Sequence, residues 1–113
     1  MHILLTLMRM KDINNSIEYM DNRLSLYSAQ NGKCAVTGRV LELGEIHCHH
    51  KTLRKQGGTD KYNNLVLVSD KIHILIHATD EKIISAYTEM LHLDAKQKAK
   101  LNKLRRSANL FTI

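Results

Sequence analysis

The feature that most constrains the fold of this 113-residue chain is a set of histidines at fixed spacing. His73 and His77 stand four residues apart in an apolar run, and on a helix two residues at this spacing lie on the same face. The adjacent pair His49 and His50 comes upstream, in a stretch with strand character. Because neutral imidazole is the commonest side-chain ligand for transition metals, the pattern predicts a helix and a strand that meet at one metal ion.

Strand geometry complicates the use of both upstream histidines. Side chains alternate between the faces of a regular strand, so His49 and His50 point to opposite sides unless the strand bends or ends there. His47 shares a face with His49 and is therefore an alternative ligand. A lone histidine on an apolar helix is usually a hydrogen-bonded core residue. Here a second one follows at helical spacing, which favours metal binding.

Composition places the chain among small proteins that bind polyanions. A chain of this length forms one domain and can bury a modest core without disulfides. The net charge of +6 favours nucleic acid as a partner, although a protein can also be basic without such a partner. Two cysteines, Cys34 and Cys48, cannot make a four-thiolate zinc site. No secretory or membrane-spanning segment is evident, which favours a reduced, cytoplasmic setting.

Residues 1–30 carry apolar side chains at spacings of three and four, which predicts a helix that stops at Asn31-Gly32. The expected apolar positions are Ile13, Ile17, Met20, Leu24 and Tyr27. The candidate caps at its start are Asp12, Asn14 and Asn15.

After Lys33 the pattern changes to short apolar runs separated by polar residues and glycines. Three of these runs are candidate strands: 34–36, 45–49 and 65–68. A polar, basic loop that contains Gly57-Gly58 separates the last two. Three helices follow, with candidate starts at Ser69-Asp70, Thr79-Asp80 and Asp94. Leu101 and Leu104 face inward from the last helix, and the whole pattern predicts a small α+β fold.

Three motifs together resemble a known family. They are Glu45-Ile-His-Cys-His49-His50, then Gly57-Gly58-Thr-Asp60-Lys-Tyr62-Asn-Asn64-Leu-Val-Leu-Val, then His73-x3-His77. This series resembles the HNH, or ββα-metal (His-Me finger), nucleases, and it is most similar to the nuclease domain at the C-terminal end of group II intron-encoded reverse transcriptase–maturases. The resemblance implies a nuclease core at 30–79, preceded by a helical segment at 1–29 and followed by C-terminal helices at 80–113.

The resemblance also implies a role for each motif residue. His50 resembles the general base that activates water, and Asn64 resembles the residue that orients this base through an amide hydrogen bond. His49, His73 and His77 resemble the ligands of one divalent metal ion, with Mg or Mn expected for activity and Zn, Ni or Co as alternatives. The residues expected to contact DNA phosphates are Lys51, Arg54, Lys55 and Lys61.

The implied activity is metal-dependent hydrolysis of DNA phosphodiester bonds inside a bacterial-type cell. DNA is the substrate, and in a parent protein the intron RNA and reverse transcriptase are further partners. The alternative function is a non-catalytic nucleic-acid-binding module in which the histidines hold a structural metal. A second basic group on the last helix is either a further DNA contact or a solvated helix face; its members are Lys96, Lys98, Lys100, Lys103, Arg105 and Arg106.

One departure from the family concerns its structural zinc. Many relatives hold a zinc ion with two cysteine pairs around the core. Here the corresponding positions are Cys34, Thr37, Ser69 and Ile72. Because three of the four thiolates are missing, we expect no structural zinc knuckle, and helix packing would have to replace its stabilisation.

Overall fold

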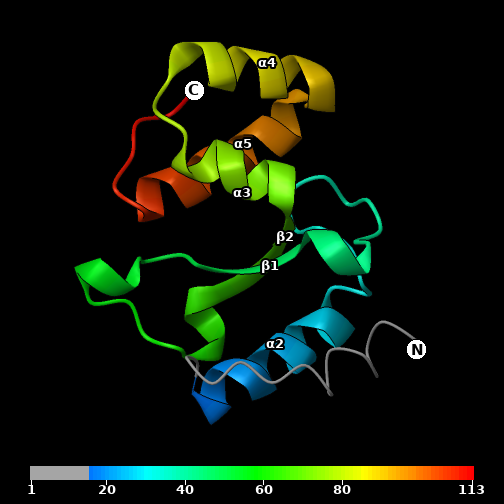
Figure 1. The fold of residues 1–113 in the computed structure, drawn as a ribbon, viewed down its shortest axis with the longest axis vertical. Helices are drawn as coiled ribbons and strands as arrows, with labels where there is room; N and C mark the ends of the chain where they lie inside the picture. Colours follow the sequence, from blue (N-terminus) through cyan, green and yellow to red (C-terminus); the bar gives the residue numbers. More distant parts are fainter. Residues whose placement is uncertain (1–15) are drawn as a thin grey trace.

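The computed structural model describes residues 16–113 as an α+β domain around a two-stranded antiparallel sheet. The described helices and strands are α2 (Ile17–Ala29), β1 (Ile46–His50), β2 (Leu65–Ser69), α3 (Asp70–His77), α4 (Glu81–Leu91) and α5 (Ala95–Ser107). Figure 1 shows α2 on one side of the sheet, with α3, α4 and α5 on the other. Within this described part, no helix is both long and apolar enough to cross a membrane.

Helix α2 begins at Ile17, within the segment that the sequence pattern predicts to be helical. Ser16 is its N-cap and accepts a hydrogen bond from the backbone N–H of Tyr19. The expected position Ile13 and the caps expected at 12, 14 and 15 lie outside the described residues. Ile17, one of the apolar positions of the pattern, is 78% exposed and does not contribute to the core, whereas Leu26 is buried there.

The sheet is made by β1 and β2, which confirms the expected strands near 45–49 and 65–68. Its register pairs His49 with Val66 and His50 with Leu65. Residues directly opposite each other in the two strands share a face of the sheet. Consecutive residues along β1 face opposite sides because the strand is pleated. His49 accordingly faces α3, whereas His50 faces α2 and its Tyr19.

The segment 34–36 is not a strand, which corrects the sequence interpretation. It forms a tight turn, closed by a bridge between Lys33 and Val40 and by a hydrogen bond from the Gly38 N–H to the Cys34 carbonyl. Cys34 and Val36 are both buried in the core. Their alternation therefore reflects burial of a turn rather than a pleated strand, and three residues are too few for periodicity to distinguish the two.

The loop between the strands turns at two glycines, and each is required for a different reason. Gly57 has a φ of +89°, a left-handed conformation that favours glycine. At Gly58 an added Cβ would overlap the Thr52 carbonyl oxygen. These two positions let the loop fold back toward the end of β1.

The three C-terminal helices begin where the sequence predicts. Ser69 caps α3, Asp80 caps α4, and Asp94 forms a capping box with Gln97 at the start of α5. Leu101 and Leu104 are buried, as expected from their spacing. The caps fix the direction in which α3 leaves the sheet, and α3 carries two of the candidate metal ligands.

Arg105 joins α5 to the C-terminal end of α3. Its side chain is only 3% exposed, and its guanidinium donates to the backbone carbonyls of Leu75 (2.6 Å), Ala78 (2.8 Å) and Phe111 (2.7 Å). Two of these carbonyls are groups that a helix end leaves without an intrahelical partner. Arg105 is therefore an internal cap for α3, which corrects its assignment to a basic surface.

We expect Arg105→Met to lower the free energy of unfolding by roughly 2–4 kcal/mol, because it leaves buried carbonyl oxygens without donors. The matched control is Arg106→Met. Arg106 is the exposed neighbour on the same helix, so its replacement should change stability by less than about 0.5 kcal/mol. Urea unfolding followed by circular dichroism measures both, and equal stability of the two variants would contradict the capping role.

Candidate metal centre

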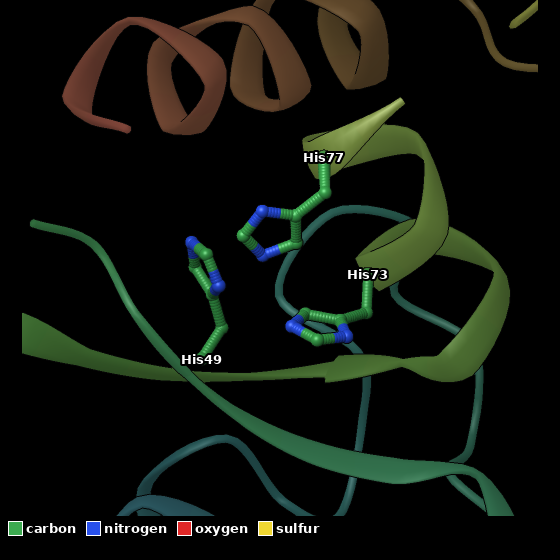
Figure 2. Close-up of side chains that lie close together, drawn as sticks. All are labelled: His49, His73 and His77. Carbon is green, nitrogen blue, oxygen red and sulfur yellow. The ribbon is translucent and has the colours of Figure 1, made fainter. Parts of the chain in front are cut away.

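Three imidazole rings converge between β1 and α3. His49 comes from the strand, and His73 and His77 come from successive turns of the helix; Figure 2 shows the three rings directed toward one another. One ring nitrogen from each residue lies within 4.8 Å of the other two. The ring centroids are 5.4 Å apart for His49–His73, 5.2 Å for His49–His77 and 4.7 Å for His73–His77. The convergence expected from the spacing is therefore present.

His49 carries a polar atom that the protein itself does not satisfy. Its side chain is 2% exposed, and its Nε2 has no hydrogen-bond partner. A buried polar atom without a partner costs free energy, so such an atom in a stable fold calls for an explanation. A metal ion bound through this nitrogen would supply the missing interaction.

The electrostatics of the cluster favour neutral rings. Burial, followed by the neighbouring rings of His73 and His77, lowers the pKa of His49 to about 3. Burial and then His77 lower the pKa of His73 to about 4. The pKa of His77 is lowered by burial and by the charges of Lys55 and Arg105. Metal ligation requires the neutral imidazole, so the donor set fits one divalent ion of the kind that accepts nitrogen ligands.

His47 does not join the cluster. Its ring stacks on His73 with centroids 4.7 Å apart and an interplanar angle of 14°. In that arrangement the two rings meet face to face, whereas a nitrogen lone pair points outward in the ring plane. The ring nitrogens of His47 are accordingly not among the three that gather, and this favours His49 over His47 as the strand's ligand.

His50 lies on the other face of β1, within a different set of contacts. Its Nε2 is 2.8 Å from Oδ1 of Asp60, and its ring stacks on Tyr19 with centroids 5.5 Å apart. The guanidinium of Arg54 lies over the same tyrosine ring and 3.4 Å from Asp60 Oδ1. Hydrogen bonds from His50 and then Ser16 hold the pKa of Asp60 below its usual value. His50 thus has an acidic partner that the sequence motifs assigned no role.

Asn64 fixes the loop after His50 rather than the His50 ring. Its side-chain amide accepts from the Thr52 N–H (2.9 Å) and donates to the carbonyls of Thr52 (3.1 Å) and Thr59 (2.8 Å). Its backbone carbonyl accepts from the N–H of Lys51. The Asn64 amide therefore makes its hydrogen bonds across the loop, to Thr52 and Thr59, in place of the expected direct hydrogen bond to His50.

The basic residues of the loop lie at different distances from the cluster. Lys55 is exposed and close enough to His77 to lower its pKa, whereas Lys61 is exposed beside the 3-10 turn that precedes β2. Lys51 lines a hollow of about 170 Å³ together with Lys100 and Lys103 of α5. Part of the C-terminal basic group therefore meets the basic loop at one surface.

Cys48 lies between two histidines in sequence but points away from their face. Its place in the ladder sends its side chain toward α2, where Tyr19 donates to its backbone carbonyl. Burial raises the pKa of the Cys48 thiol to about 11, and Cys34 is also a free thiol. The strand therefore offers nitrogen, and not sulfur, to the metal centre.

Asp60 and Tyr19 are the residues that sequence reasoning missed. Asp60 stands ten positions after His50, and only its place beside the glycine pair marks it. Nothing in the sequence distinguishes Tyr19 from the other tyrosines.

The chain matches no protein-family model, no curated protein and no solved structure.

We expect one Zn²⁺ or Co²⁺ ion per chain in equilibrium dialysis, and His73→Ala to weaken its binding by at least about 100-fold, because a ligand is lost rather than an outer partner. The matched variant is His47→Ala, which removes a ring from the same face but outside the cluster. It should retain full stoichiometry. Loss of the ion from His47→Ala and not from His73→Ala would reverse the ligand assignment.

The lowered pKa values also predict how the metal-free protein responds to acid. Below the ordinary histidine pKa of 6.5 the unfolded chain binds protons that folded His49 and His73 do not, so stability falls as pH falls. Between pH 7 and pH 5 we expect a loss of roughly 2–4 kcal/mol, measured by urea unfolding after chelation. His49→Leu should show a smaller loss, and constant stability across this range would contradict the burial of neutral rings.

Proposed function

We propose that this chain is a metal-dependent DNA endonuclease of the HNH, or ββα-metal, type. The observation that carries the proposal is the cluster of His49, His73 and His77, with His50 next in sequence and held by a carboxylate. The ligands lie on β1 and α3, and β2 connects the two, so the order strand–strand–helix corresponds to the ββα unit. Phosphodiester hydrolysis needs a general base and a cation, and His50, the last residue of β1, offers a candidate base one residue after the ligand His49.

The chain's own residues would divide the reaction between them. His49, His73 and His77 would hold a divalent ion, Mg or Mn for activity or else Zn, Ni or Co; when bound, this ion would polarise the phosphate and stabilise the leaving 3′ oxygen. His50 would take a proton from water, and the resulting hydroxide would attack phosphorus in line. The P–O3′ bond would then break, and the 3′ oxygen would take a proton from water, leaving 5′-phosphate and 3′-hydroxyl ends.

The distribution of positive charge supports a polyanionic substrate. Lys51, Lys100 and Lys103 line one hollow that has no acidic residue in its wall, and Val66, the partner of His49 in the ladder, lines it too. Lysines gathered in this way attract phosphate and release counterions when they bind it. A DNA strand that crosses this hollow would therefore run beside the metal centre, with Lys55 next to His77 on the loop side.

The surroundings of Cys34 support the same family. Cys34, Thr37 and Ser69, three of the positions that would carry zinc-binding thiolates in relatives, line one hollow of about 210 Å³, and Ile72, at the fourth position, is fully buried. Three of the four corresponding positions therefore border one hollow, and this supports the resemblance. By this resemblance we propose a cytoplasmic role in group II intron mobility, with intron RNA and a reverse transcriptase as partners in a parent protein.

A second candidate function is a nucleic-acid-binding module in which the metal is structural. The burial of His49 favours it, because an ion bound there would hold β1 against α3. The two functions differ in their need for His50, which lies outside the cluster. They also differ in outcome, because only the nuclease produces nicked DNA.

We expect supercoiled plasmid to be nicked when the metal-free protein is supplied with a series of divalent ions. His50→Ala should lower the nicking rate by roughly 10²–10⁴-fold, because a general base is lost. Binding of the ion and of duplex DNA should stay unchanged in that variant, as measured by dialysis and fluorescence anisotropy. His47→Ala, on the same strand but outside the cluster, serves as the control and should nick at the wild-type rate.

Two results would contradict the nuclease. Wild-type nicking by His50→Ala would remove that residue from the reaction. No nicking with any ion, combined with unfolding on chelation, would instead support the structural-metal module.

A further inference from the structure

We infer that Asp60 is a positioning residue for His50, and that α2 holds Asp60 in place. In this arrangement the Asp60 carboxylate keeps the ring proton of His50 on Nε2 and leaves Nδ1 as the nitrogen that can accept a proton. The inference deepens the proposed function, since its catalytic meaning depends on His50 acting as the base. It assigns a second role to a helix that lies outside the β1–β2–α3 unit.

The direction of the hydrogen bond follows from the chemistry of the two groups. An ionised carboxylate only accepts hydrogen bonds, and its separation of 2.8 Å from His50 Nε2 is that of a strong, charge-assisted bond. Nε2 must therefore be the donor. A neutral imidazole carries one N–H, so Nδ1 then presents a lone pair. This is the tautomer that a general base requires if it acts through Nδ1.

Arg54 competes with Asp60 for His50 Nε2, and a hydrogen bond from Arg54 would require the other tautomer of the ring. Its Nε–H lies 3.2 Å from His50 Nε2, and a bond there would require Nε2 to be the acceptor. Nε2 cannot donate to Asp60 and accept from Arg54 at once. The shorter contact is to a charged acceptor and is the stronger of the two, and Asp60 also attracts the Arg54 guanidinium to its own Oδ1 at 3.4 Å. Without Asp60, Arg54 would favour the opposite tautomer.

Helix α2 positions the carboxylate through two hydrogen bonds. The Ser16 hydroxyl donates to Asp60 Oδ2 at 2.5 Å, and the Asn22 side chain donates to the Asp60 backbone carbonyl at 2.8 Å. Both carboxylate oxygens are therefore engaged, one by His50 and one by α2. Because the Ser16 oxygen also caps α2 by accepting from the Tyr19 N–H, the start of this helix and the acid are joined at one hydroxyl.

Tyr19 completes the arrangement on the ring side. Its ring stacks on His50 at an interplanar angle of 8°, and its hydroxyl donates to the Cys48 carbonyl at 3.2 Å. Burial, followed by the neighbouring Cys48, raises the pKa of Tyr19, so the hydroxyl stays a donor. The stack on Tyr19 thus fixes the plane of the His50 ring, and the hydrogen bond to Asp60 fixes the rotation of the ring within that plane. Tyr19 belongs to α2, and Asp60 is held by residues at the start of α2 and within it.

The test uses Asp60→Asn, which preserves the shape of the side chain but not its hydrogen bonding. With the Ser16 hydroxyl still donating to the amide oxygen, the amide –NH₂ faces His50 and donates to Nε2. The His50 proton should then move to Nδ1, which removes the accepting lone pair. Asp80→Asn is the matched control, because asparagine is an equally good N-cap and Asp80 caps α4 away from His50.

The first readout is the ¹⁵N spectrum of His50 in the full chain at about pH 8, where an ordinary imidazole is neutral. We expect the Nε2–H tautomer in the wild type and in Asp80→Asn, and the Nδ1–H tautomer in Asp60→Asn. The second readout is plasmid nicking, which Asp60→Asn should slow by roughly 10³-fold or more, as expected for a base in the wrong tautomer. Metal stoichiometry should be unchanged.

The outcomes separate the two proposals. A purely structural role for Asp60 predicts that the isosteric Asp60→Asn keeps both the wild-type tautomer and the wild-type nicking rate, and that result overturns the inference. An Nδ1–H tautomer in the wild type overturns it as well. If the spectra change as expected but the wild type nicks no DNA with any ion, then Asp60 does position His50 and the proposed nuclease function fails.

Discussion

The pleat of β1 is the constraint on which the candidate site depends. Consecutive residues of a strand face opposite sides, so the neighbours His49 and His50 serve different surroundings without any bend in the backbone. His49 joins two helical histidines on the α3 side of the sheet, and His50 meets an acid and an aromatic ring on the α2 side. The ladder with β2 fixes this division, because a slip of one residue would exchange every side chain between the two faces.

Local patterns predicted much of this structure. Helical spacing brought His73 and His77 to one face, and short-range capping chemistry located the starts of α3, α4 and α5, because both effects act within one or two turns of helix. The same kind of reasoning failed at Cys34 and Val36, where three residues alternate in burial without pairing as a strand. It also did not predict the exposure of Ile17, which depends on what α2 packs against rather than on its own sequence.

Polar residues with distant partners were beyond the reach of sequence reasoning. Asp60 depends on Ser16, 44 positions away, and the guanidinium of Arg105 finds the carbonyl of Leu75 across 30 positions. Neither residue belongs to a periodic pattern, since each satisfies a buried or half-buried group that only the folded chain brings near. Even the role of Asn64, which the family resemblance points to, took a different form once its partners Thr52 and Thr59 were known.

The placement of Cys48 has a consequence for which cations the protein would accept. A thiolate bound beside three imidazoles would turn a borderline donor set into a soft one and would favour ions such as Cu(I). Strand parity keeps this sulfur on the opposite side of the sheet, and its high pKa keeps the proton on it. The thiol of Cys48, only one residue from His49, therefore does not reach the three histidines. The cluster keeps an all-imidazole donor set, which accepts harder divalent ions than a set with a thiolate would.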